Sequence, residues 1–238
     1  MTMSIRLLCL DLGGTIVDDH DAAGRALRRA IIDCGIPDGT DRMERAMSIA
    51  TATLGQSRAA VFHEIFRNPQ QADFAYARFD STFRAIVSAG GLLPIPGVDT
   101  LLEELRAAGI SVCVMTGLSP DLRDVVLEEL GWTNKVDLAL SAEDVGRGRP
   151  WPDLILSAAL RREIDDVRAV AVAGDTVSDL VAGYRAGASH LIGVTGGAHG
   201  RDELLLAPHT HLVERVTEIG PILLTSRRLD SLGRRADR

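Results

Sequence analysis

The chain has 238 residues and a formal net charge of −7. That acidic balance excludes a nucleic-acid footprint, because binding to a phosphate backbone needs clustered positive charge. No apolar run reaches the ~18 residues of a membrane-spanning helix, and none has the form of a secretory signal. We therefore expect a cytoplasmic globular protein, a monomer or homodimer, with no nucleic-acid or membrane partner.

The first predicted element is a strand over residues 5–10, which ends at Asp11 and the turn residues Gly13, Gly14 and Thr15. A short continuous apolar run of this kind is typical of a strand that is buried in a parallel sheet. Almost a hundred residues then precede the next apolar run, which is too long for a single crossover. Helical spacing within them predicts helices at 22–34, 42–53, 58–66 and 72–89. We assign residues 17–93 to an inserted all-helical cap domain, which ends at glycine and proline turns.

The rest of the chain alternates between the two kinds of element. Apolar runs predict strands at 110–115, 136–140, 167–173 and 190–194, and amphipathic stretches predict helices at 98–108, 119–130, 150–161 and 178–186. This alternation predicts an α/β fold, a doubly wound parallel sheet with helices on both faces. We assign residues 1–16 and 94–226 to this core, and residues 227–238 to a flexible tail with little to bury.

Polar residues gather where the predicted strands end. In open α/β sheets, ligands bind at the carboxyl ends of the strands. The residues expected at that edge are Asp11, Thr116, Gly117, Arg149, Asp175 and Asp179.

Four segments around these residues match a known order of motifs. Asp11-Leu-Gly13-Gly-Thr15, Met115-Thr116-Gly117, Arg149-Pro-Trp-Pro152 and Gly174-Asp175-Thr-Val-Ser-Asp179 resemble the four motifs of the haloacid dehalogenase (HAD) superfamily. One such motif would be weak evidence, whereas four in order at the expected places are specific. The resemblance covers nearly the whole chain. It implies a hydrolase with a HAD-like Rossmannoid core and a helical cap between the first and second motifs.

The resemblance also implies a role for each residue. Asp11 would be the nucleophile that forms an aspartyl-phosphate and divides the displacement into two steps. Thr116 would donate a hydrogen bond from its hydroxyl to a phosphoryl oxygen. Arg149 would neutralise the same phosphoryl group, to which its guanidinium can donate two hydrogen bonds at once. Gly117 and Thr15 are predicted to bind the substrate beside these catalytic groups.

A carboxylate that attacks a phosphate needs added positive charge. Asp175 and Asp11 can hold Mg²⁺ through the hard oxygen ligands that it prefers, and Asp179 can bind it directly or through water. By the resemblance, Gly13 would contribute its backbone carbonyl to the same metal. The alternative for Asp179 is an acid in the first turn of a helix, favoured by the helix dipole.

Gly13 departs from the pattern of the superfamily's phosphatases. They usually carry a second aspartate at this place, which protonates the leaving alcohol and activates water. A positioned acid or base contributes ~10²–10⁴ in rate, and glycine provides neither. Asp18, Asp19 and His20 follow the motif and are candidates for the missing group. The alternative is that they form a solvated hinge turn.

A non-acidic residue at this place, together with an arginine at the place of Arg149, resembles the pattern of the phosphonoacetaldehyde hydrolase branch. In that branch a cap lysine forms a Schiff base with the substrate. The segment Leu54-Gly55-Gln56-Ser57-Arg58 resembles the matching stretch, with Arg58 at the place of the lysine. A guanidinium stays protonated and does not form that imine. Lys135, the only lysine, lies in the predicted core domain after the second motif and not in the cap, so it is a poor substitute. We therefore expect a phosphonatase-like protein that is not a phosphonoacetaldehyde hydrolase, with Arg58 either binding an anionic substrate group or lying on a surface helix.

The leading hypothesis is a Mg²⁺-dependent hydrolase of a small anionic phosphorylated or phosphonylated metabolite, gated by cap closure. Cleavage of a C–O or a C–P bond stays open. A second hypothesis is a dehalogenase that uses Asp11 on a carbon–halogen bond. It needs no metal, so Asp175 and Asp179 count against it. A third, prompted by Gly13, is a phosphate-binding protein with little turnover.

Overall fold

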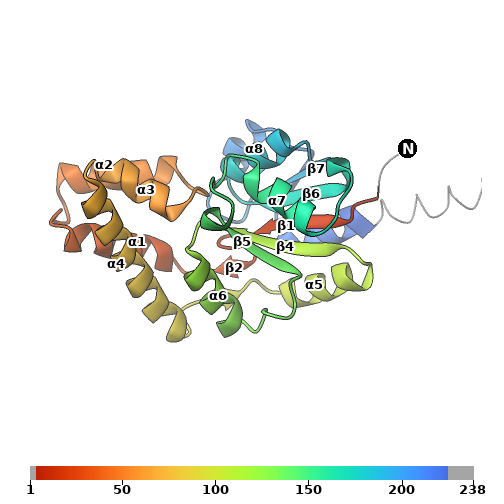
Figure 1. Ribbon diagram of the computed structural model, residues 1–238, viewed down its shortest axis with the longest axis horizontal. Coiled ribbons are helices and arrows are strands. Elements are labelled where there is room, and N and C mark those ends of the chain that lie inside the picture. Colours follow the sequence, from red (N-terminus) through yellow and green to blue (C-terminus); the bar gives the residue numbers. More distant parts are fainter. Residues whose placement is uncertain (1–3, 225–238) are drawn as a thin grey trace, which may run out of the picture.

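The computed structural model describes residues 4–224, so the tail predicted for residues 227–238 lies outside the described residues. Its centre is a six-stranded sheet with the order β5-β4-β1-β6-β7-β8, shown in Figure 1. Each neighbouring pair of strands is parallel. The strands are β1 (Leu7–Asp11), β4 (Ser111–Thr116), β5 (Leu138–Ser141), β6 (Val170–Gly174), β7 (His190–Val194) and β8 (His211–Val213).

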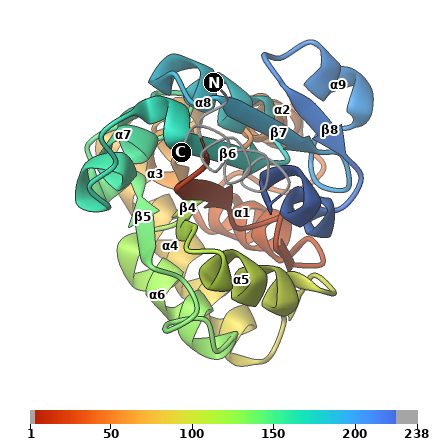
Figure 2. The same ribbon diagram turned by 90° about the vertical axis from the view of Figure 1, so that its right-hand side faces the viewer.

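Helices cover both faces of this sheet, α5 and α6 on one side and α7 and α8 on the other, as Figure 2 shows. Along β1, Leu8 and Leu10 join the hydrophobic cluster of α5 and α6, whereas Leu7 and Cys9 join that of α7 and α8. Burial on both faces explains why the strand is continuously apolar. The helices are α5 (Val98–Ala107), α6 (Pro120–Glu129), α7 (Asp153–Arg161), α8 (Val177–Ala186) and the short α9 (Arg201–Leu205).

A helical layer is inserted between two very short strands, β2 (Val17–Asp18) and β3 (Leu93–Pro94). The strands pair antiparallel, Val17 with Pro94, so the chain enters and leaves the layer at one place. Figure 1 shows its helices as a group beside the sheet. They are α1 (Ala22–Asp33), α2 (Asp41–Ala52), α3 (Arg58–Ile65) and α4 (Pro69–Ser88). The predicted fold class is confirmed, whereas the exact domain boundaries at 17 and 93 stay a prediction.

Two local predictions were wrong. The helix expected from residue 150 begins at Asp153, because the residue before a proline is disfavoured in the helical region and prolines follow both Arg149 and Trp151. The Arg149–Pro150 peptide bond is cis. The strand expected from residue 167 begins at Val170, after a 3-10 turn over Val167–Ala169. Strand β8 and the β2–β3 pair were not predicted. Within residues 4–224, no helix has the length and apolar character needed to cross a bilayer.

Candidate active site

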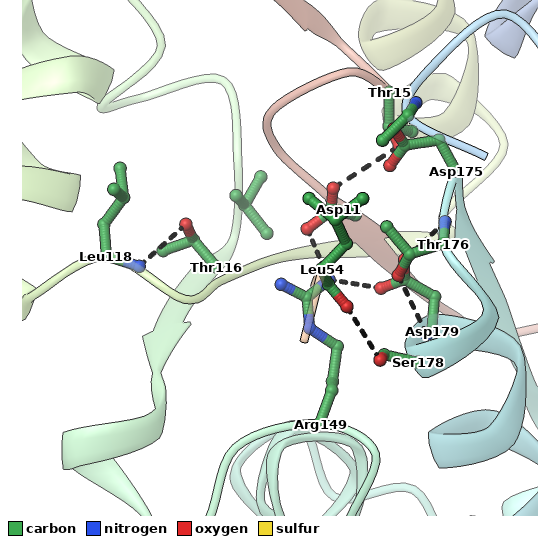
Figure 3. A network of polar contacts seen from close by, with 12 residues as sticks. Asp11, Thr15, Leu54, Thr116, Leu118, Arg149, Asp175, Thr176, Ser178 and Asp179 are labelled. Carbon is green, nitrogen blue, oxygen red and sulfur yellow. Dashed lines mark hydrogen bonds and ion pairs between the residues drawn. The ribbon is translucent and has the colours of Figure 1, made fainter. Parts of the chain in front are cut away.

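The three central strands bring the predicted site residues together. Asp11 is the last residue of β1, Thr116 is the last of β4, and Asp175 directly follows β6. Because β4 and β6 flank β1 in the parallel sheet, their carboxyl ends meet at one edge. Figure 3 shows the side chains of these residues gathered at that edge with Arg149 and Asp179.

Three carboxylates form the centre of the site. Asp11, Asp175 and Asp179 are buried and offer oxygen atoms that lie within 4.8 Å of one another. Thr15 Oγ1 lies 3.0 Å from Asp175 Oδ1, to which it donates a hydrogen bond, and 3.5 Å from Asp11 Oδ2. The amide of Ala198 donates to Asp175 Oδ2 at 2.6 Å.

Asp179 is both a helix cap and a member of this cluster. Its Oδ2 accepts hydrogen bonds from the amide of Thr176 at 3.1 Å and from its hydroxyl at 2.5 Å. The hydroxyl of Thr176 in turn caps the amide of Asp179, which completes a capping box at the start of α8. Its other oxygen, Oδ1, pairs with Arg149. Asp179 is therefore an acid in the first turn of a helix and also lies beside the other two carboxylates, and its role as a metal ligand stays a prediction.

Arg149 neutralises only part of this charge. Its Nη1 donates to Asp11 Oδ1 and to Asp179 Oδ1. Burial would lower the pKa of Arg149, but the pairing with Asp11 and Asp179 outweighs it and raises that pKa. Burial also raises the pKa of Asp11, and repulsion by Asp179 and Asp175 adds to the rise against the opposing effect of Arg149.

This donor set fits a divalent cation. Within residues 4–224, Arg149 is the only cationic side chain that forms ion pairs with the three carboxylates. A buried cluster with more negative than positive charge is costly unless a bound proton or a further cation compensates it. Three hard oxygen ligands at this spacing suit Mg²⁺. Gly14 brings the backbone against the same cluster, since a Cβ atom there would lie 2.2 Å from Asp175 Oδ2.

Thr116 has a hydroxyl proton to donate. Its Oγ1 accepts a hydrogen bond from the amide of Leu118 at 3.2 Å, which leaves the hydroxyl hydrogen free to point elsewhere. Ser119 accepts from the amide of Leu122 and so caps α6 beside it. The predicted helix start at 119–120 is therefore present next to the site.

The inserted helical layer of α1 to α4, which corresponds to the predicted cap and is called the cap below, lies directly on the core at this site. The amide of Arg58 donates to the carbonyl of Gly117 at 2.8 Å, and Ser178 donates to the carbonyl of Leu54 at 2.8 Å. A Cβ atom at Gly117 would lie 2.2 Å from the carbonyl oxygen of Gln56. Only glycine permits this approach. Residues 54–58, which comprise the turn after α2 and the first residue of α3, lie over the strand ends and are here named the cap loop.

A cavity of about 890 Å³ lies between cap and core. Most of the predicted site residues line it, namely Asp11, Gly13, Arg58, Thr116, Gly117, Arg149 and Asp175. Thr15 and Asp179 are fully buried outside that lining. For Thr15, the placement favours a role in positioning the carboxylates over the substrate contact that we predicted.

Arg58 faces this cavity and has no counter-ion there. Within residues 4–224, its guanidinium forms no ion pair and no hydrogen bond, and its nearest aromatic contact is the ring of Phe79 at 5.8 Å. Burial lowers the pKa of Arg58, and the neighbouring charge of Asp19 partly offsets the effect. An unpaired guanidinium in a cavity is suited to an anionic ligand, which favours that interpretation over a surface helix residue.

Two sets of contacts at the site were not predicted from the sequence. The loop after β7 holds Asp175 through Ala198, and Gly197 allows the close approach because a Cβ atom there would lie 2.1 Å from Asp175 Oδ2. The glycine pair that follows the apolar run at 190–194 was the available signal. Contacts between cap and core left no such signal: Ser119 donates to Asp80, and Tyr76 donates to Glu143 at 2.7 Å.

Comparison with known proteins gives consistent results. The model of the haloacid dehalogenase-like hydrolase family matches residues 5–187. The protein named "Probable phosphatase IndB" of Dickeya dadantii is 31% identical over 90% of this chain and 91% of its own length. A phosphonoacetaldehyde hydrolase of Bacillus cereus is 31% identical over 54% of this chain and 50% of its own.

The fold has close relatives among solved structures. The crystal structure of a phosphonoacetaldehyde hydrolase like protein from Oleispira antarctica superposes with a TM-score of 0.79 at 22% identity, covering 95% of this chain and 94% of that one. At that identity the likeness shows the fold alone. Together with the family match and the relatives, it establishes that the chain belongs to the haloacid dehalogenase-like hydrolases.

Proposed function

We propose that this hydrolase cleaves a phosphorylated or phosphonylated metabolite through an aspartyl-phosphate on Asp11, with Mg²⁺ as cofactor. The observation that carries the proposal is the buried cluster of Asp11, Asp175 and Asp179 around Arg149, open to a cavity beneath the cap. Screening phosphorylated and phosphonylated metabolites, with and without Mg²⁺, tests it. Turnover that requires both a phosphoryl group and the metal is the expected result.

In this proposal, a carboxylate oxygen of Asp11 attacks phosphorus and the leaving group departs with its bonding electron pair. Water then attacks the aspartyl-phosphate and restores the carboxylate. Thr116 donates its hydroxyl to a phosphoryl oxygen, and Arg149 neutralises the negative charge beside it. The metal, held by Asp11, Asp175, the carbonyl of Gly13 and directly or indirectly by Asp179, would supply further positive charge.

The cap would control access and recognise the substrate. We assign residues 17–93 to a cap that opens about the β2–β3 pair, and Arg58 to the binding of an anionic substrate group. Closure would hold Arg58 over the strand ends and exclude bulk water while Asp11 attacks phosphorus. The dehalogenase alternative, which needs no metal, does not account for the clustering of Asp175 and Asp179 beside Asp11.

Magnesium is expected to raise the thermal unfolding temperature of the wild-type protein, because a ligand that binds only the folded state stabilises it. Asp175→Asn should weaken Mg²⁺ binding by about 100-fold or more, since losing even an outer-shell partner costs ~10–100-fold. Asp179→Asn should weaken it less, because both Asp179 oxygens already accept hydrogen bonds from Arg149 or Thr176. Titration calorimetry of the two variants measures the difference.

The exposed Asp165→Asn serves as the matched control, since its side chain is 93% exposed and forms an ion pair with Arg6 on the surface, away from the cavity lining. It should bind Mg²⁺ like wild type. Equal activity of the wild-type protein in chelator and in millimolar magnesium would contradict the metal assignment and favour the dehalogenase hypothesis.

Borohydride with phosphonoacetaldehyde is expected to leave no covalent adduct in the active site. Lys135 pairs with Asp99 at 2.5 Å and does not line the cavity, and Arg58 cannot form the imine. Peptide mass spectrometry after reduction would detect an adduct, and Lys135→Arg should keep full turnover of any substrate found. A reduced adduct on Lys135 that blocks turnover would show the expectation to be wrong.

A further inference from the structure

The cavity under the cap is larger than a phosphoryl group with a short carbon chain requires. Its volume of about 890 Å³ lies near the top of the ~300–1,000 Å³ range of pockets that enclose drug-sized ligands. The site residues at the strand ends occupy one part of its wall. The remaining space must therefore accommodate another part of the ligand or the solvent.

The rest of the wall is mostly apolar and comes from both layers. It includes Leu27 of α1, Met47 and Ala50 of α2, Leu54 of the cap loop, Phe83 of α4 and Leu118 of the core. We name these six residues the apolar chamber. Most of them are buried or nearly so, and the chamber is therefore an interior surface rather than an outer face of the cap.

Charged groups also line the cavity. Arg58 interacts electrostatically with Asp19, where the chain enters the cap, and with Asp11 and Arg149 at the strand ends. Asp18 and Asp21 line the cavity and are exposed. By contrast, the six side chains of the chamber offer neither a charge nor a side-chain hydrogen-bonding group, Met47 contributing only a weakly accepting thioether.

We propose that the apolar chamber binds the leaving-group part of the substrate, and that this part is a bulky hydrocarbon or aryl group rather than a two- or three-carbon polar unit. The identification of the ligand as a phosphoryl compound rests on the proposed function. The six residues line the same cavity as Asp11 and Thr116, so the substituent of a phosphoryl group bound at the strand ends lies in the cavity that they line. Burial of that substituent is favourable in proportion to the apolar area removed from water.

A series of n-alkylphosphonates from ethyl to hexyl tests this without turnover. Their dissociation constants, measured by calorimetry on the full chain with magnesium, should fall about three- to fourfold per methylene, as expected for complete burial of each group. Equal affinities across the series, or no binding of hexylphosphonate, would overturn the proposal.

Two variants of α2 locate the effect. Met47→Gln keeps the length of the side chain but makes it polar, and should weaken hexylphosphonate about tenfold with little change for ethylphosphonate. Ile49→Gln is the matched control on the same helix, at a half-buried position that does not line the cavity, and should leave both affinities unchanged. An equal loss in both variants would contradict the location of the chamber.

Failure of the proposed function would give a different experimental result from failure of the apolar chamber. Hydrolysis of p-nitrophenyl phosphate reports on Asp11, whereas the phosphonate series reports only on the chamber. Turnover with flat affinities would retain the hydrolase and overturn the chamber. Affinities that rise with chain length, in a protein that hydrolyses no phosphoryl ester, would retain the chamber and overturn the hydrolase.

Discussion

Replacing Asp11 with asparagine is expected to lower turnover by about 10⁴- to 10⁶-fold, the range seen when a catalytic residue that acts in concert with others is removed. The amide has nearly the shape of the carboxylate but is no nucleophile towards phosphorus. The fold should persist, because burial and the repulsion of Asp179 and Asp175 already disfavour a charge at this position. Loss of the contact with Arg149 is the opposing effect.

The complex of beryllium with fluoride, which mimics an acyl phosphate, separates loss of chemistry from loss of structure. It should raise the thermal unfolding temperature of the wild type and leave Asp11→Asn unchanged. Asp165→Asn, an exposed substitution of the same kind, should behave like wild type in both assays. Full activity in Asp11→Asn would remove the nucleophile assignment, and protection of that variant by the complex would weaken it.

The sequence predicted the edge of the sheet at which Asp11, Thr116 and Asp175 meet, for a physical reason. Strands buried on both faces are continuously apolar, so their ends are sharply marked by the first polar residue. Parallel strands direct all those ends to one edge. By contrast, β2 and β3 are two residues long each, too short for any periodicity to be visible.

Contacts between cap and core could not be read from the chain. Asp80 and Ser119 are 39 residues apart, and Tyr76 and Glu143 are 67 residues apart. No local pattern links such pairs. The same holds for Arg58, whose orientation into the cavity depends on how the cap loop lies against Gly117. The residue types of the candidate site can be predicted from the sequence. Which of these residues line the cavity depends on how the cap packs against the core.

The contacts of Asp18, Asp19 and His20 argue against each of them as the missing acid. Both oxygens of Asp19 accept hydrogen bonds from backbone amides, those of Asp21 and Ala23, at the start of α1. Asp18 lines the cavity but pairs with His20 at 3.1 Å, and both side chains are 54% exposed. These contacts favour a solvated hinge turn, and leave Gly13 as the place where an acid is absent.

Gly13→Asp is therefore expected to raise the hydrolysis of unactivated phosphomonoesters, whose alkoxide leaving group needs a proton. The structure has room for the change. A Cβ atom at Gly13 meets nothing within 4 Å, and the backbone φ lies outside the left-handed region that disfavours a side chain. The upper limit is the ~10²–10⁴ that positioned proton transfer provides. We expect about tenfold, since no neighbouring group was selected to orient the new carboxylate.

Two substrate classes, measured side by side, identify the origin of the gain. An alkyl phosphate should respond, whereas p-nitrophenyl phosphate should respond much less because its phenolate leaves with little help. Gly13→Asn, similar in shape but not an acid, is the matched control and should give no gain with either. If Gly13→Asp folds and binds Mg²⁺ but shows no selective gain, the absence of an acid at this place does not limit the rate. Either a group such as Asp18 or His20 then supplies the proton, or the natural leaving group departs without one.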